Sequence, residues 1–378
     1  MTNPLTWKSW PPYAVGVGIG LLSWFSFATA DHPLGISTAF EYTAALTEKA
    51  VVPGVEQTNG YFSAKAEEGK SPKIGWEWML VLGVFVGALV SSRLSGDHSP
   101  ETVPALWRWR FGGSPGKRLI VAFLAGGVMM FGARLAQGCT SGHGISGSLQ
   151  LAASSWVFTA VFFAVATATA LPSTGSKEPN MFDSPDKLLL GLATGIVFGF
   201  LLQKGRVAKF PVIVGQFLLK DWTVVKIMGT AVVVGAVGVF ALVAAGYASL
   251  HVKPLLLGGV LLGGVLFGVG MVVLGYCPGT SVAACGEGRR DAMAGVLGMF
   301  AGSLAFVAAW SALQPVGKAL GNEGKVTIPD LTGTSPWLWI AGMTLAGIAG
   351  AVVLHGHSNS TGPSSVPPGI PAGSGAET

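Results

Sequence analysis

The chain has 378 residues, of which 50% are hydrophobic and only 11% are charged, and its formal net charge is +5. The strongly positive mean hydropathy excludes an ordinary soluble domain. The basic residues are spread over short loops and form no Lys/Arg block with interleaved aromatic residues, so we expect the lipid bilayer as a partner and no nucleic acid.

About nine apolar runs are long enough to cross a hydrocarbon layer, which takes about 20 helical residues. In chain order they begin near Tyr13, Gly75, Lys117, Leu149, Lys187, Thr223, Pro254, Asp291 and Pro336. The gaps between them are too short to fold alone, so we expect an all-α polytopic membrane protein with a single transmembrane domain over residues 1–356. The longest gap, residues 31–74, is predicted to be a polar loop.

Both ends of the chain carry a processing or disorder signal. The first run ends in Ala28-Thr29-Ala30, which resembles the cleavage site of a signal peptide. A spanning first helix is the simpler interpretation, because eight further runs follow. Residues 357–378 are rich in Gly, Pro, Ser and Ala and are predicted to form a disordered tail, since they cannot bury enough apolar surface to offset their ordering entropy.

The most basic loops, residues 93–118 and 204–226, are expected to face the cytoplasm. Three apolar runs lie between them, an odd number that would place them on opposite sides if every run crossed the membrane. The region around Cys139 is the natural place for the chain to break and turn back, because glycines flank the thiol. Non-helical backbone at that depth is tolerated where it is buried in protein or lines a cavity.

Two cysteines occupy matching positions in the two halves of the chain. Residues 138–143 read Gly-Cys-Thr-Ser-Gly-His, and residues 275–279 read Gly-Tyr-Cys-Pro-Gly. Aligning Cys139 with Cys277 also aligns glycines in the apolar runs that precede them. Interrupted hydrophobic segments in corresponding positions are typical of secondary transporters. We therefore expect two pseudo-symmetric repeats of inverted orientation, over about residues 12–171 and 187–356, whose broken helices meet near the midplane.

Three stretches resemble the YeeE/YedE family of sulfur-compound transporters. Residues 132–147 are close to the family's central Gly-Cys-Thr-Ser-Gly-His signature. Residues 277–292 are similar to its Gly-Cys-Pro loop with trailing Glu-Gly and Asp-Ala pairs, and residues 198–223 to its second-half entry loop. The likeness covers most of the chain from about Pro33 to Val353.

The resemblance implies uptake of thiosulfate by a multi-pass protein of the bacterial inner membrane with an hourglass-like helical fold. It also implies that Cys139 and Cys277 pass the substrate along through thiol hydrogen bonds. The chain departs from the family in three places. It has no cysteine before Cys139, and Ser37 takes the place of a family cysteine in the first polar loop. Tyr276 stands before Cys277, where a glycine is common in the family. Gly279 and Thr280 follow Pro278, where an arginine often appears two residues after the proline.

Thiosulfate has a soft terminal sulfur and three hard oxygens, so a selective path needs weak donors for the first and oxyanion donors for the others. A neutral thiol is polarizable and a weak donor, whereas a thiolate would repel the dianion. We therefore expect both thiols to stay protonated. Cys285 has no partner in the other half, and a structural role is slightly favoured for it, although a path role stays open.

The remaining candidates surround the two cysteines. Arg134 lies in an apolar run, where it could attract the dianion or complement the helix dipole. His143 could donate to an oxyanion or be satisfied by the backbone. The candidate oxygen donors are the side chains of Gln137, Thr140, Ser141 and Thr280, and the loop residues Gly138, Pro278 and Gly279 complete the predicted path with Ser37.

The sequence contains no motif for catalysis, ATP hydrolysis or metal binding, so we expect no enzyme activity and no cofactor. A soluble cytoplasmic sulfurtransferase is a possible acceptor of the cargo. Two alternatives stay open. One is a transporter of sulfite, a selenium species or another sulfur anion, and the other is a membrane thiol-redox or persulfide-relay protein.

Overall fold

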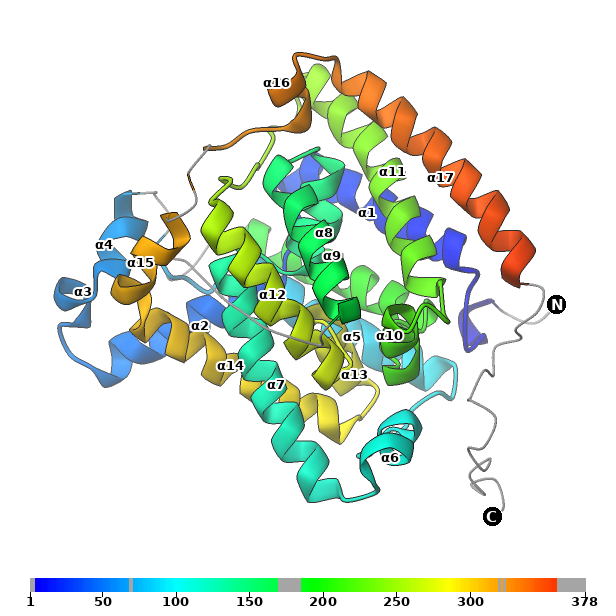
Figure 1. Ribbon diagram of the computed structural model, residues 1–378, viewed down its shortest axis with the longest axis horizontal. Helices are drawn as coiled ribbons and strands as arrows, with labels where there is room; N and C mark the ends of the chain where they lie inside the picture. The colour runs from blue at the N-terminus through cyan, green and yellow to red at the C-terminus, as the bar shows by residue number, and fades with distance from the viewer. Residues whose placement is uncertain (1–3, 68–70, 169–184, 319–320, 322–323, 359–378) are drawn as a thin grey trace.

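The computed structural model describes residues 4–67, 71–168, 185–318, 321 and 324–358 and is helical throughout that part (Figure 1). The only β-type pairing within the described residues is an isolated bridge between Ala152 and Thr327. The elements are η1 Pro4–Thr6, α1 Pro12–Ala30, α2 Ser37–Val51, α3 Val55–Thr58, α4 Gly60–Glu67, α5 Trp76–Leu94, α6 Ala105–Phe111, α7 Pro115–Leu135, η2 Thr140–Gly147, α8 Ala153–Ala168, α9 Pro185–Lys204, α10 Phe210–Phe217, α11 Thr223–Ala244, α12 Leu257–Leu274, α13 Pro278–Gly286, α14 Arg290–Ala308, α15 Trp310–Lys318, α16 Ile328–Thr332 and α17 Pro336–Ser358.

Seven helical segments among the described residues are long and apolar enough to cross a membrane. They are α1, α5, α7, α9, α11, α14 and the span Leu257–Gly286, which consists of α12 and α13. Two of the predicted runs, those near Leu149 and Pro336, correspond to shorter apolar helices over residues 153–164 and 336–350. Large apolar side chains such as Ile120 and Leu297 lie exposed on the outside of these helices, as expected for a surface that faces lipid. The all-helical, multi-pass prediction is confirmed.

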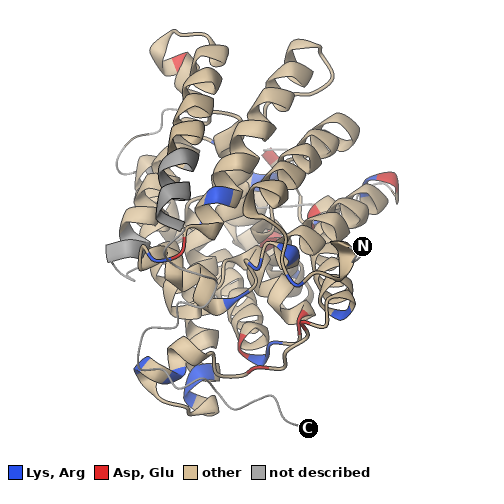
Figure 2. Ribbon diagram, turned by 90° about the vertical axis from the view of Figure 1, so that its right-hand side faces the viewer, with Lys and Arg blue, Asp and Glu red and all other residues tan. Residues whose placement is uncertain are grey.

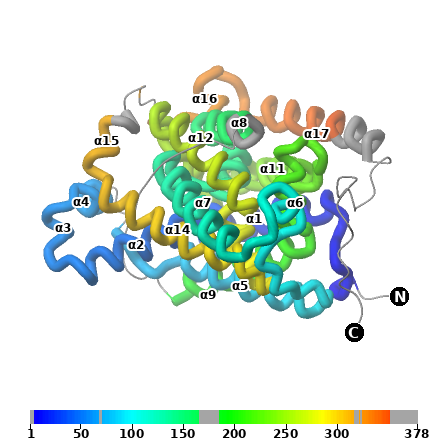
Figure 3. The backbone as a smooth tube through the Cα atoms, turned by 60° about the horizontal axis from the view of Figure 1, so that its bottom comes forward, coloured from blue at the N-terminus to red at the C-terminus, as the bar shows by residue number. Residues whose placement is uncertain are grey.

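The prediction of a polar loop over residues 31–74 is wrong. This region contains α2, α3 and α4, which form a lobe at one side of the bundle together with α15 (Figures 1 and 3). The ring of Tyr61 in α4 contacts that of Trp310 in α15, with centroids 5.9 Å apart. Helix α2 forms because Ala44 and Ala45, among other apolar residues, share its buried face. The predicted tail over residues 357–378 falls almost entirely outside the described residues.

Glycines allow the long helices to pack closely in pairs. In α9, Gly191 lies against Trp76 and Gly199 against Val84, so α5 and α9 run in the same direction. In α1, Gly16 lies against Ile227 of α11, and that pair is also parallel. Helices α7 and α14 pack in parallel, whereas α7 and α12 pack antiparallel. Close backbone approach of this kind stabilises helix pairs where lipid supplies no hydrophobic drive.

A Gly87→Ala variant is expected to lower the free energy of unfolding by about 1–3 kcal/mol, because the new Cβ would overlap the carbonyl oxygen of Ile196 in α9. Thermal unfolding in detergent measures the change. Gly342→Ala in α17 is the matched control, since a Cβ there meets no atom within 4 Å and alanine favours the helix. Equal unfolding temperatures for the two variants would contradict the close packing of α5 and α9.

Ion pairs join the loops at one end of the bundle. The ammonium of Lys209 lies 2.7 Å from a carboxylate oxygen of Asp97 and 2.9 Å from one of Glu287. The basic regions 93–118 and 204–226 therefore meet at the same end. Figure 2 shows long stretches of helix without charge, and many of the charged residues in loops and near helix ends.

The helical path is interrupted at both cysteines. Helix α7 ends at Leu135, Gln137 adopts a left-handed backbone with φ of 62°, and the π-helical segment η2 begins at Thr140. Helix α12 ends at Leu274, Gly275 has φ of 81°, and α13 follows. Each thiol thus lies between the end of a long helix and the start of a short one.

Candidate functional site

Cys139 is 1% exposed and lies directly before η2. Its sulfur is 3.2 Å from the hydroxyl oxygen of Ser141. The hydroxyl of Ser37 and the backbone amides of Ile36 and Gly142 are also close enough to interact with this sulfur. The start of α2 and the start of η2 therefore meet at one thiol. Donors arranged in this way orient a thiol and stabilise negative charge on sulfur.

Cys277 caps the start of α13. Its backbone N–H donates to the hydroxyl of Thr280 at 2.8 Å, and the backbone N–H and hydroxyl of Thr280 lie 3.4 and 3.2 Å from the Cys277 sulfur. This reciprocal pattern is a capping box, which fixes the rotamer of the cysteine side chain. Thr140, the residue after Cys139, lies near the Cys277 sulfur, and the two thiols are close enough to interact electrostatically.

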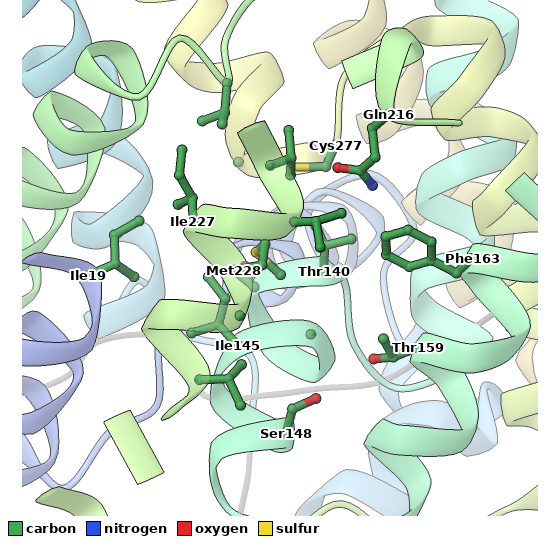
Figure 4. Close-up of a pocket in the computed structure, with 18 of the residues that line it drawn as sticks. Ile19, Thr140, Ile145, Ser148, Thr159, Phe163, Gln216, Ile227, Met228 and Cys277 are labelled. Atoms are coloured by element: carbon green, nitrogen blue, oxygen red, sulfur yellow. The ribbon is translucent and has the colours of Figure 1, made fainter. Parts of the chain in front are cut away.

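A cavity of about 410 Å³ adjoins the second thiol (Figure 4). None of the described residues that line it is charged, and most of its wall is apolar. Its polar lining comes from four segments: η2, the start of α13, α8 and α10. The polar lining side chains are those of Thr140, Ser141, Ser148, Trp156, Thr159, Gln216, Cys277 and Thr280.

The structure therefore divides the predicted path residues into two groups. Those that line the cavity are Thr140, Ser141, Cys277, Gly279 and Thr280. Those that lie outside its described lining are Ser37, Arg134, Gln137, Gly138, Cys139, His143, Pro278 and Cys285. All three cysteines are free thiols, and Cys285 is in the last turn of α13, away from the pair.

Arg134 is buried together with an acidic partner that lies far away in the sequence. Its guanidinium forms an ion pair with Glu41 of α2 and donates to the hydroxyl of Ser37 at 3.0 Å. The two charges compensate each other inside the protein. Arg134 thus holds the start of α2, and with it Ser37, beside the Cys139 loop.

His143 is fully buried and both of its ring nitrogens have partners. Nε2 lies 2.6 Å from the carbonyl oxygen of Ala136, and Nδ1 lies 2.8 Å from the hydroxyl of Ser155. Because a carbonyl only accepts, Nε2 donates, and a neutral ring then accepts from Ser155. The ring also stacks on Phe158 at 4.5 Å. These contacts assign His143 to holding the loop in place.

Lys253, which sequence analysis did not single out, reaches the Cys139 loop from the segment before α12. Its ammonium donates to the carbonyl oxygen of Gln137. A Cβ at Gly138 would overlap this ammonium and would lie 2.8 Å from a carbon of the His143 ring, so glycine is required there. The sequence feature that marks Lys253 is its position directly before the apolar run that begins at Pro254.

The other half of the chain has a matching cation. The guanidinium of Arg118, in the first turn of α7, donates to the carbonyl oxygens of Val273 and Leu274 at the end of α12, at 3.1 and 2.6 Å. Arg118 also pairs with Asp291 at 2.6 Å, and both side chains are fully buried. A cation at a helix C-terminus complements the helix dipole. A basic side chain therefore contacts the carbonyl oxygens at the end of each broken helix. Arg118, at the start of α7, contacts the end of α12, and Lys253, shortly before α12, contacts Gln137 after the end of α7.

The segment that carries Lys253 is fixed to the end of α1. Asp31 accepts hydrogen bonds from the backbone N–H and hydroxyl of Ser249, at 3.0 and 2.6 Å, and pairs with His251 at 3.2 Å. Burial raises the pKa of Asp31, but the hydrogen bonds from Ser249 and the contact with His251 outweigh it, so this pKa lies below its usual value. Asp31 is therefore an ionised anchor for this loop at neutral pH.

Comparison with known proteins places the chain among sulfur transporters. A family model described as sulphur transport matches residues 1–169 and 204–370. The chain is 25% identical over 324 residues to a probable transporter, YedE, of Escherichia coli, covering 71% of this chain and 74% of that protein. It is 29% identical over 161 residues to the thiosulfate transporter TsuA of Spirochaeta thermophila, covering 39% of this chain and 49% of that protein. A probable transporter of Xylella fastidiosa is 38% identical over 90 residues, 24% of this chain and 58% of that protein.

Proposed function

Because the chain belongs to the sulphur transport family, we propose that it imports thiosulfate across the bacterial inner membrane, with the thiols of Cys139 and Cys277 as successive sulfur-binding sites. The observation that carries this proposal is that the two thiols lie close enough to interact, each at the start of a short helix, and that Cys277 lines a cavity with no charged side chain among its described lining residues. Helix N-termini favour anions through their unpaired N–H groups and the helix dipole. Two weak sites also suit transport, because the substrate must leave each of them.

The proposal includes two inverted repeats, and the helix pairing supports them. Under the shift that aligns Cys139 with Cys277, η2 corresponds to α13 and α7 to α12. The same shift carries α8 onto α14, so the pair of α7 with α14 corresponds to that of α12 with α8. By their order in the two halves, α1 corresponds to α9 and α5 to α11, so the parallel pair of α5 with α9 corresponds to that of α11 with α1. In this arrangement the broken helices of the two halves approach the midplane from opposite sides.

The orientation follows from charge. The basic loops at residues 93–118 and 204–226 face the cytoplasm in this proposal. Helix α11 begins at that end and crosses the bundle, so the segment with Lys253 faces the outside. The substrate then meets Lys253 and the Cys139 loop first and the cavity at Cys277 second. A soluble sulfurtransferase would receive it at the cytoplasmic end.

Uptake of sulfur-labelled thiosulfate into proteoliposomes tests the function. We expect saturable uptake that unlabelled thiosulfate competes fully. Sulfite, sulfate and a selenium analogue of thiosulfate are the competitor arms, and stronger competition by any of them than by thiosulfate would assign the cargo to that anion. Absence of labelled uptake by a folded, correctly inserted protein would reject thiosulfate import.

Replacing Lys253 by methionine is expected to raise the KM for thiosulfate about tenfold at low ionic strength and to leave the maximal rate unchanged, because the cation attracts the dianion to the outer entrance. Lys253→Arg should keep the wild-type KM, and the gap between variant and wild type should shrink as salt is added. Lys49→Met is the control, since Lys49 pairs with Glu56 in the lobe. A KM for Lys253→Met that equals the wild-type value at every salt concentration would contradict a role in recruitment.

A second candidate function, a thiol-redox or persulfide relay, is favoured by one observation. The hydroxyls of Ser37 and Ser141 and two backbone amides surround the Cys139 sulfur, and such donors stabilise a thiolate. This candidate predicts a reversible disulfide between Cys139 and Cys277. Maleimide labelling as a function of pH, with a redox-dependent gel shift, separates the two functions: transport by neutral thiols requires labelling that rises only in alkaline solution and no gel shift.

A further inference from the structure

Gln216 is a buried amide whose acceptor atom has no partner. It lies in the last turn of α10 and is 4% exposed, and its side-chain oxygen Oε1 has no hydrogen bond with any described residue. It lines the cavity, and Figure 4 shows its amide group directed toward the side of the cavity where Cys277 lies. A buried polar group without a partner costs about 1–3 kcal/mol. No described residue therefore holds this end of the amide in place, and rotation can bring its NH₂ end, a donor, to the same position.

Two further polar groups in the same cavity are also unpaired. The indole N–H of Trp156 and the hydroxyl of Thr159 are buried and have no hydrogen-bond partner among the described residues. Both residues line the cavity. They are three residues apart on α8 and therefore project from the same face of that helix. Three unpaired polar groups from two helices thus share one largely apolar chamber.

The packing of α10 fixes this arrangement. Phe217, the neighbour of Gln216, contacts Phe162 and Phe163 of α8 with ring centroids 6.0 Å apart in each case. At the other end of α10, Phe210 contacts Tyr276, the residue before Cys277, at 6.1 Å. Helix α10 therefore bridges α8 and the Cys277 loop, and the Gln216 amide lines the same cavity as the α8 donors and the thiol.

We propose that Gln216, Trp156 and Thr159 form an oxyanion subsite that binds the oxygens of the substrate while its sulfur faces Cys277. This inference rests on the proposed function and adds the residues that recognise the other end of the anion. An amide NH₂ group, an indole N–H and a hydroxyl are all donors. The amide presents its NH₂ group to the oxyanion by rotating about its last side-chain bond, since its two ends have nearly the same shape.

Uncharged donors fit a transport site. A fixed cation in an apolar chamber would hold a dianion tightly, because charges attract strongly in a medium of low dielectric constant. Neutral donors replace part of the hydration shell of the anion and release it again. The subsite accepts tetrahedral sulfur oxyanions as a class, and the thiol of Cys277 distinguishes those with an exposed soft sulfur.

The test is protection of Cys277 from alkylation by N-ethylmaleimide in the full-length protein, followed by mass spectrometry of the Cys277 peptide. Thiosulfate is the protecting probe. Gln216→Leu is expected to raise the half-protecting thiosulfate concentration by about tenfold or more, because a hydrogen bond to a charged group is lost. Thr159→Val and Trp156→Phe are expected to raise it about three- to tenfold, and Gln216→Asn should retain part of the protection.

Thr344→Val in α17 is the matched control, because the Thr344 hydroxyl donates to the Ile340 carbonyl of its own helix at 2.7 Å. Monodisperse elution in detergent identifies folded variants, and Thr159→Val keeps the test decisive if Gln216→Leu does not fold. Half-protecting concentrations of the folded variants within twofold of wild type would overturn the subsite, as would a wild-type protein that thiosulfate does not protect. Protection that is lost in Gln216→Leu, in a protein that does not take up thiosulfate into proteoliposomes, would support the subsite and reject transport.

Discussion

A Cys139→Ala variant is expected to lower thiosulfate uptake by up to about 100-fold while folded protein remains in the membrane. The Cys139 sulfur is the centre on which η2 and the start of α2 converge. Alanine leaves those donors without their sulfur partner and removes the soft contact for the substrate. Loss of one hydrogen bond to a charged ligand costs up to about 3 kcal/mol, which corresponds to about a 100-fold effect.

Growth of cells with thiosulfate as the only sulfur source, and uptake into proteoliposomes, measure this effect. Cys285→Ala is the matched control, because Cys285 is a free thiol in the last turn of α13, eight residues after Cys277 and away from the start of η2. We expect it to transport at close to the wild-type rate. Undiminished growth of cells that carry Cys139→Ala would reject the role proposed for the first thiol.

An Asp291→Ala variant is expected to lose about 3–5 kcal/mol of stability, because it leaves the guanidinium of Arg118 buried without its counter-ion. Both side chains are fully buried. The guanidinium carbon lies 4.7 Å from the ring centroid of Trp107 and 4.9 Å from that of Phe210. Two carbonyl oxygens of α12 remain as its partners in the variant. They do not neutralise its charge.

Thermal unfolding and the yield of monodisperse protein in detergent measure this loss. Glu56→Ala is the matched control, because the Lys49–Glu56 pair is exposed, with 48% of each side chain accessible. Exposed ion pairs contribute about 0–1 kcal/mol. If the two variants unfolded at the same temperature, the ion pair between Arg118 and Asp291 would not be what stabilises the packing of α7, α12 and α14.

The double variant Arg118→Met with Asp291→Leu separates charge from packing. Because it removes both charges together, it should recover much of the stability that Asp291→Ala loses. Recovery of this kind would show that the unpaired charge, rather than the missing carboxylate contacts, destabilises the single variant. A double variant as unstable as the single one would assign the effect to packing around Tyr276 and Phe210 instead.

The sequence by itself determined that this is a helical, multi-pass membrane protein, because a segment must be about 20 apolar residues long to cross lipid. The sequence also determined that the chain belongs to the sulphur transport family. It also identified the two cysteine loops, since glycine and polar residues interrupt apolar runs there. It failed over residues 31–74, where α2 is amphipathic and gains its stability from packing on the bundle.

Only the tertiary structure decided which side chains meet. Glu41 pairs with Arg134, Lys253 reaches Gln137, and Gln216 enters the cavity from a helix that also contacts α8. These partners are far apart in the chain, and no local pattern marks them. Helix periodicity determines which face of a segment is apolar, but the neighbour of that face depends on how the helices pack. Burial without a partner, the property that singles out Gln216, exists only in the folded protein.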